Sequence, residues 1–207
     1  MNWPTRSIKD TLEILTAPGA PFEMREETVR GRRLRTYVNA ACDLKSLLDA
    51  SRRYGNRDFL VYEDDRVSFE GHWRAANAFA RVLQDTFGIT KGDRIAIAMR
   101  NYPEWSVCSW GILSLGAIMV PLNAWETGKN LAHMLSDSGA RLVVLDEERF
   151  DRLEGAVPSV ERVLVRSSRV GRSLEDLIGP VSEYSNLPDV PAPGVDLQPD
   201  DFATMFF

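Results

Sequence analysis

Three short apolar segments, separated by two helical patterns, constrain the fold of this chain more than any other feature. The segments cover residues 95–97, 117–122 and 141–145, and their length and β-branched content are typical of buried strands. The intervening residues predict helices at about 103–115 and 127–138. A strand, helix, strand, helix, strand order predicts an α/β fold, with a mostly parallel sheet flanked by helices.

Capping residues predict where the helices begin and end. Asp43, Ser68 and Ser173 each precede a helical pattern, and Asn101 lies before the Pro103 that opens the first crossover helix. Gly139 is placed to end the second crossover helix, at about 127–138. The remaining expected elements are helices at 43–55, 68–88, 148–153 and 174–178, two short strands joined at Asp64-Asp65, and a strand at 162–165.

The same pattern divides the chain into three parts. Residues 1–42 predict an arm with a hairpin around Gly31, and 43–178 predict the α/β subdomain. Residues 179–207 predict a proline-rich linker that ends in an apolar strand at 202–207.

Composition restricts the partners. With 25 basic and 30 acidic residues, the net charge of −5 gives no field that would collect nucleic acid. The basic run at 30–35 is interpreted as a solvated hairpin face, with a site for phosphate or an acidic partner as the alternative. Cys42 and Cys108 form no CxxC pattern, which favours a reducing, cytoplasmic setting. Residues 105–125 carry no charge, but their serines, glycines and proline favour a helix followed by a strand over a membrane span.

No recognised active-site motif is present. The sequence has no GxGxxG, GxxxxGK[ST], GxSxG or HExxH pattern, and the turn at 99–103 has no glycine to admit a phosphate group. His72 and His133 are interpreted as ordinary histidines, and the carboxylates at 64–65, 146–148 and 200–201 as capping or turn residues. The sequence therefore assigns no catalytic, cofactor-binding or metal-binding residue.

An ordered set of motifs at 91–148 resembles the N-terminal part of the AMP-forming acyl-CoA synthetases and their adenylate-forming relatives. The set comprises GDRIA at 92–96, NYPE at 101–104, GAIMVPLN at 116–123 and DSGA at 137–140. Residues 67–83 resemble the family's preceding strand and helix, except at Gly71-His72, where the family usually has a leucine. The similarity covers about residues 43–207.

The resemblance implies a function for a longer chain. Such an enzyme activates a carboxylic acid with Mg-ATP to an acyl-adenylate, and the thiol of coenzyme A then displaces AMP. Residues 199–207 match the segment that leads into the family's phosphate loop, so we expect a truncated N-terminal subdomain that needs the remainder of its own chain and is inactive alone.

Two alternatives stay open: an acyl-AMP ligase that loads a carrier protein, and a naturally short, non-catalytic binding or regulatory module. The apolar end at 202–207 predicts a homo-oligomer.

Overall fold

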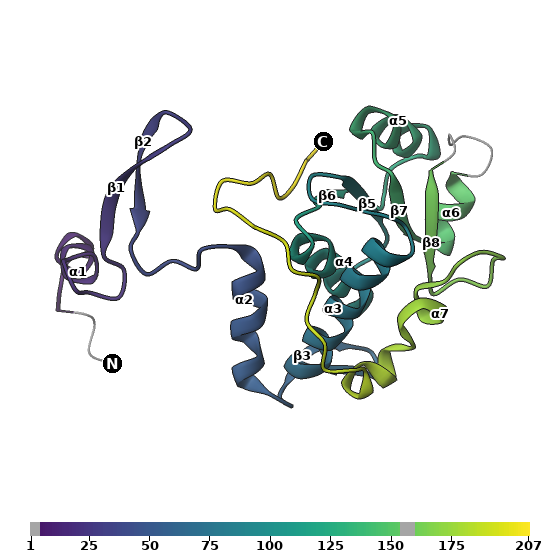
Figure 1. Ribbon diagram of the computed structural model, residues 1–207, viewed down its shortest axis with the longest axis horizontal. Helices are drawn as coiled ribbons and strands as arrows, with labels where there is room; N and C mark the ends of the chain where they lie inside the picture. The colour runs from purple at the N-terminus through teal and green to yellow at the C-terminus, as the bar shows by residue number, and fades with distance from the viewer. Residues whose placement is uncertain (1–4, 154–159) are drawn as a thin grey trace. The chain divides into compact units, whose positions relative to one another are not determined.

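The computed structural model describes residues 5–153 and 160–207, which divide into two compact units (Figure 1). Residues 1–42 and 198–200 form one unit, and residues 43–197 and 201–207 form the other. In the smaller unit, α1 (Ile8–Leu15) precedes the strands β1 (Met24–Val29) and β2 (Arg32–Tyr37). The larger unit contains α2 (Leu44–Ser51), η1 (Arg52–Tyr54), β3 (Asp58–Tyr62), β4 (Asp65–Ser68), α3 (Phe69–Asp85), β5 (Arg94–Ala98), α4 (Pro103–Ser114), β6 (Ile118–Pro121), α5 (Gly128–Ser138), β7 (Leu142–Asp146), α6 (Glu147–Arg152), β8 (Glu161–Val165), α7 (Leu174–Ile178) and η2 (Val181–Asn186).

The smaller unit contains the hairpin that the sequence predicts. β1 pairs with β2 in antiparallel register, and the turn residues Arg30 and Gly31 have φ of 49° and 76°. Two consecutive positive φ values are typical of the tight turns whose twist matches that of the strands. β3 and β4 form a second antiparallel hairpin, in the larger unit. Its turn lies at Glu63-Asp64, one residue earlier than expected, because Asp65 already pairs with Tyr62.

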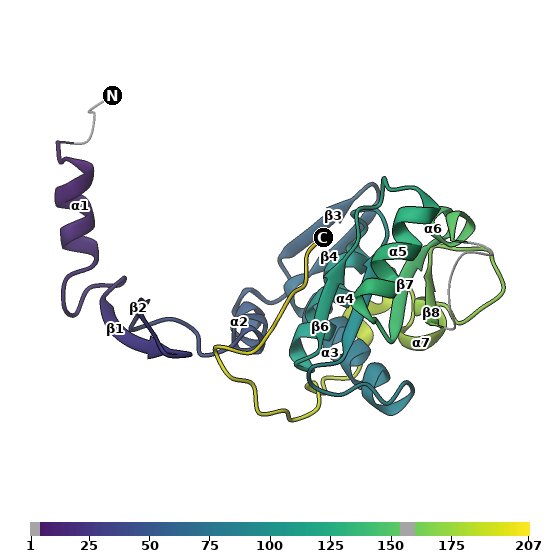
Figure 2. The same cartoon turned by 90° about the horizontal axis from the view of Figure 1, so that it is seen from above.

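The central sheet of the larger unit confirms the predicted fold class. Its strand order is β6-β5-β7-β8, and each neighbouring pair is parallel. The apolar side chains alternate between its faces, as the two-residue period of a strand requires. Ile95, Ile97 and Val144 pack with α3, α4 and α7 on one face, and Ala96 and Val143 pack with α5 on the other (Figure 2).

Most of the predicted helix ends are confirmed. The side chains of Asp43, Ser68 and Ser173 each accept a backbone N–H at the start of a helix, at 2.7 to 3.0 Å. Gly139 ends α5 in the left-handed conformation. The prediction for Asn101 is wrong. Because Pro103 is the first residue of α4, Tyr102 occupies the capping position and provides no side-chain cap.

Residues 187–197, called the proline segment below, belong to the stretch at 179–207 that the sequence predicts as a linker and strand, and they pack on the core of the larger unit. It has no regular secondary structure, yet Ala192 is buried. Its backbone carbonyls accept hydrogen bonds from Arg74, Arg81 and Lys91. The Ala192 N–H donates to Asn77, which is fully buried on α3. Side chains of α3 and of the turn that follows it thus satisfy backbone groups that a sheet would otherwise pair.

The apolar segment at 202–207 forms only part of the expected strand. Thr204 makes a single parallel bridge with Met119 of β6, supported by hydrogen bonds on both sides of Met119 at 2.9 Å. Met205 packs against the core, while Phe202 and Phe206 are 69% and 78% exposed.

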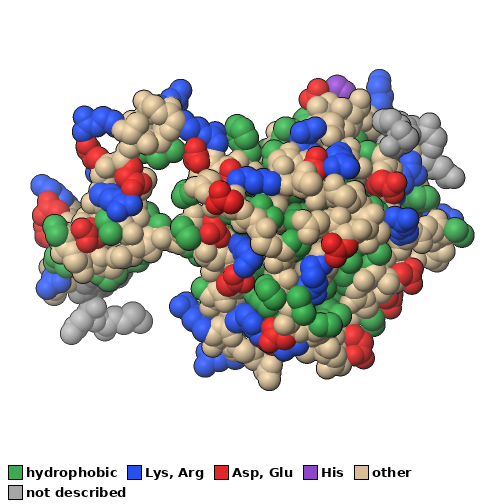
Figure 3. Space-filling view, in the orientation of Figure 1, with side chains coloured by type: hydrophobic (Ala, Val, Ile, Leu, Met, Phe, Trp, Pro, Cys, Tyr) green, Lys and Arg blue, Asp and Glu red, His purple; other side chains and the backbone are tan. Residues whose placement is uncertain are grey.

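Charged side chains of both signs are interspersed on the face drawn in Figure 3. Within the described residues, no helix has the length and apolar character needed to cross a membrane.

Candidate functional site

The carboxyl ends of four parallel strands meet at one edge of the sheet, and this edge is the candidate site. The chain leaves β5 toward β6 on one side and returns to β7 on the other, so the connections diverge between β5 and β7. Ligands of open α/β sheets bind at such a point, outside the carboxyl ends of the strands. The loops there are 99–102 after β5 and 122–127 after β6, with α6 following β7 directly.

A hollow of about 320 Å³ opens between the first two loops. It is lined by Tyr62, Met99, Arg100, Asn101, Tyr102, Ala124 and Trp125. The Arg100 guanidinium carbon lies 4.3 Å from the centre of the Trp125 ring, and Trp125 is 69% exposed. Asn123 accepts the Trp125 N–H at 3.1 Å, which fixes the turn that presents the indole.

The hollow offers both an aromatic face and a cation. In the described part of the chain, no carboxylate pairs with the Arg100 guanidinium, so its N–H groups are available to an anion. Burial, followed by the charge of Asp146, raises the pKa of Tyr102, so its phenol stays protonated at neutral pH. The arrangement suits an anionic group attached to a flat ring.

A buried ion pair holds the loops of this edge together. Asp146, at the end of β7, accepts the backbone N–H groups of Arg100 and Arg149 at 3.0 Å each. The Arg149 guanidinium lies 3.1 Å from Asp146 and donates from Nε to the Ala124 carbonyl at 2.7 Å. The two side chains are 5% and 1% exposed. One pair therefore connects the loops that follow β5, β6 and β7.

Only part of this network could be predicted from the sequence. The prediction that Asp146 is a capping residue is confirmed, whereas the burial of the pair and the role of Arg149 were not predicted. The available signal was an acid at the end of an apolar strand with an arginine three residues later, a spacing that brings the side chains together on a helix.

Neither histidine lines this hollow. His72 is buried in α3 and lies 2.9 Å from the Ser106 hydroxyl, and burial lowers its pKa to about 4. His133 is exposed on α5. Cys42 is exposed and Cys108 is buried. Among residues 5–153 and 160–207, no three His, Cys, Asp or Glu side chains are grouped to hold a metal ion.

Comparison with known proteins identifies the family. The model of the AMP-binding enzyme family matches residues 47–207. This chain belongs to the AMP-binding enzyme family. The match begins after the smaller unit's first 42 residues and includes all of the parallel sheet.

Curated relatives of the chain are CoA ligases. It is 33% identical over 137 residues to a long-chain-fatty-acid–CoA ligase of Salmonella typhimurium, covering 65% of this chain and 24% of the relative. It is 30% identical over 148 residues to a crotonobetaine/carnitine–CoA ligase of Citrobacter koseri, covering 68% and 28%. The chain thus spans about a quarter of the length of these relatives.

Solved structures share the fold. The anthranilate CoA ligase AuaEII, in complex with anthranoyl-AMP, superposes with a TM-score of 0.68 at 20% identity, over 80% of this chain and 32% of that one. The N-terminal subdomain of Klebsiella oxytoca NpsA gives 0.59 at 22% identity, over 79% and 38%. The sheet described above is therefore that of the N-terminal subdomain of adenylate-forming enzymes.

Proposed function

We propose that this chain forms the N-terminal part of an AMP-forming acid–thiol ligase. In the proposed reaction, a carboxylate oxygen attacks the α-phosphorus of ATP and releases pyrophosphate, which gives an acyl-adenylate. The thiol of coenzyme A then attacks the acyl carbon, and AMP leaves.

The family match over residues 47–207 carries this proposal. CoA ligases among the curated relatives support coenzyme A, rather than a carrier protein, as the acceptor. The hollow at the carboxyl edge supports a role for this subdomain as one wall of a substrate site, with Arg100 and Trp125 facing the ligand.

The residues of this chain do not fit Mg-ATP by themselves. Phosphate loops use glycines to bring several backbone N–H groups around the phosphates, and the loop at 99–102 has no glycine. We therefore assign the binding of ATP to the part of the relatives that has no counterpart here. The contribution proposed for this chain is the placement of its loops by Asp146 and Arg149.

A chimaera tests the proposal. Residues 43–207 would replace the corresponding segment of the Salmonella ligase, and acyl-CoA formation and AMP release would be measured with a series of carboxylic acids. We expect activity in the chimaera and no carboxylate-dependent pyrophosphate exchange by the 207-residue chain alone. Pyrophosphate exchange by the 207-residue chain alone would disprove the assignment of ATP binding to the part that has no counterpart here. A folded chimaera that forms no acyl-adenylate would disprove the proposed function.

A further inference from the structure

A groove of about 380 Å³ lies between α3, the end of α7 and the start of the proline segment. We call it the Arg81 groove, after the basic side chain in its lining. It shares no lining residue with the hollow at the carboxyl edge of the sheet, so the two are separate sites. Its volume is within the range of small-molecule sites.

Most of the lining of the Arg81 groove is apolar. Three of these side chains pack against the core but are only partly buried, so the groove leaves apolar surface in contact with water. Covering such surface with the apolar atoms of a ligand is favourable. This apolar wall, which suits an aliphatic chain, consists of Ala78, Val82, Leu177, Ile178, Leu187 and Pro188.

Arg81 adds a cation with two donors that the chain does not use. Its Nη1 donates to the backbone carbonyls of Val190 and Pro191, which holds the guanidinium against the proline segment. Within the described parts of the chain, no hydrogen bond or ion pair uses its Nε or Nη2. Neither atom is among the buried polar atoms that lack a partner, so both are accessible to a ligand.

The charge of Arg81 is only partly compensated. Burial lowers the pKa of Arg81, and the charge of Asp85, one turn later on α3, offsets part of that effect. Asp85 also lines the groove and is exposed, but it forms no ion pair with Arg81. An anion that pairs with Arg81 would therefore replace hydration that the guanidinium has lost.

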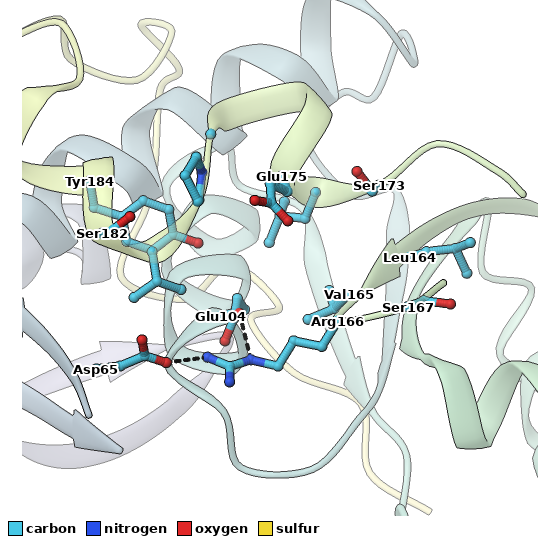
Figure 4. A pocket seen from close by; sticks show the side chains of 14 residues that line it. Asp65, Glu104, Leu164, Val165, Arg166, Ser167, Ser173, Glu175, Ser182 and Tyr184 are labelled. Carbon is cyan, nitrogen blue, oxygen red and sulfur yellow. Dashed lines mark hydrogen bonds and ion pairs between the residues drawn. The ribbon is translucent and has the colours of Figure 1, made fainter. Parts of the chain in front are cut away.

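Arg166 is a compensated guanidinium in the same unit, and the contrast supports this reading of Arg81. It lines a cavity of about 280 Å³ beside β8, where its Nε donates to Glu104 at 2.8 Å and its Nη2 donates to Asp65 (Figure 4). An anion entering that cavity would compete with two fixed carboxylates. In the Arg81 groove, no carboxylate of the described residues occupies the same two donors.

We propose that the Arg81 groove binds a small aliphatic carboxylate, whose head accepts from Nε and Nη2 of Arg81 and whose tail lies against the apolar wall. The two donors form one edge of a planar fork, and a carboxylate is the anion whose two oxygens match it. This binding site is separate from the adenylation chemistry proposed above and does not depend on it.

NMR titration of the ¹⁵N-labelled 207-residue chain at pH 7.5 tests the proposal. The probe is octanoate, with octanamide as the neutral control of matched length and acetate as the head group without a tail. We expect saturable shifts of amides at 78–86, 177–179 and 187–190 with octanoate, at a Kd of about 1 mM. Octanamide should bind at least about tenfold more weakly, and acetate should not saturate below about 50 mM.

Two substitutions change the affinity in opposite directions. Arg81→Met keeps an unbranched side chain without the charge and should weaken octanoate binding at least about tenfold. Asp85→Asn removes the repulsion from an exposed carboxylate and should tighten binding about threefold. Asp137→Asn is the matched control, because Asp137 is exposed on α5, on the opposite face of the sheet, and it should bind like the parent.

Four results would overturn the proposal. They are the absence of saturation by octanoate below about 50 mM, equal binding of octanamide, unchanged affinity in Arg81→Met, and saturable shifts confined to the hollow at 99–102 and 122–125. If Arg81→Met does not fold, an affinity of Asp85→Asn no tighter than that of the parent would overturn it.

Discussion

Replacing Asp146 by alanine should strongly destabilise the larger unit. The change removes the acceptor of two backbone N–H groups and leaves the Arg149 guanidinium, 1% exposed, without its buried carboxylate. Arg149 would keep only Glu148, which is 54% exposed, and the Ala124 carbonyl. The loops after β5, β6 and β7 would lose their common anchor.

The magnitude follows from the burial of the pair. Losing a helix cap costs about 1 kcal/mol. Stranding one partner of a buried pair costs about 3–5 kcal/mol. Since Glu148 and Ala124 offset part of the second cost, we expect a loss of about 4 kcal/mol, a large fraction of the roughly 5–15 kcal/mol that stabilises a domain.

Urea unfolding followed by tryptophan fluorescence measures the effect, because Trp73, Trp105 and Trp110 all lie in the larger unit. With a urea slope of about 2 kcal/mol per M, the midpoint should fall by about 2 M. Asp151→Ala is the matched control. Its bidentate pair with Arg169 is 40% and 49% exposed, so its loss should cost less than about 1 kcal/mol.

A double substitution separates the stranded charge from the lost cap. Asp146→Ala combined with Arg149→Met removes the uncompensated cation, so the double variant should be more stable than the sum of the single effects predicts, by about 2 kcal/mol. Two results would refute this account: free energies of unfolding of Asp146→Ala and Asp151→Ala that differ by less than about 1 kcal/mol, or additive effects of Asp146→Ala and Arg149→Met.

Three further predictions concern other parts of the chain. The pKa of His72 falls from 6.5 to about 4 on folding, so the stability that its neutral form allows is present above pH 6.5 and is lost as pH falls toward 4. The free energy of unfolding, measured with urea, should therefore be lower at pH 5 than at pH 7. We expect this difference to be about 2 kcal/mol smaller in His72→Gln than in the parent, and an equal difference would contradict the argument. Gly128→Ala should lower the melting temperature, because a Cβ there would lie 1.9 Å from the Arg152 carbonyl oxygen; Gly194→Ala, with open space, should not, and equal melting of the two would contradict this packing argument. Because exposed phenylalanines flank the single bridge of Thr204, we expect the chain to self-associate in sedimentation and a chain lacking residues 202–207 to be monomeric; a monomeric parent would contradict this.

Features that depend on neighbouring residues could be predicted from the sequence. The apolar strands β5 and β7 and the caps at Asp43 and Ser68 are set within a few positions of the chain, so pattern and propensity were sufficient. The wrong prediction of Asn101 as a helix cap also has a local cause. Pro103 is the first helical residue, so the capping position is Tyr102, one residue later than predicted.

Long-range partners could not be predicted in this way. Arg149 is buried because Ala124 and Asp146 surround it, and Glu104 pairs with Arg166, which lies 62 positions later in the chain. A single sequence gives the residue types but not these pairings. The composition of the proline segment is typical of a linker. Its packing could not be predicted, because its hydrogen-bond partners are more than 100 residues away in the sequence.

That distance has a consequence for how the chain folds. Arg74, Arg81 and Lys91 precede the carbonyls that they bind by 113, 109 and 105 residues. During synthesis, these cations and the buried amide of Asn77 are made long before their partners leave the ribosome. Contacts of such separation form slowly, because a long loop must close before any hydrogen bond rewards it. The proline segment should therefore dock last in folding, and its amide hydrogens should be the first to exchange with solvent. The amide of Ala192, which donates to Asn77, is the one to follow by hydrogen exchange.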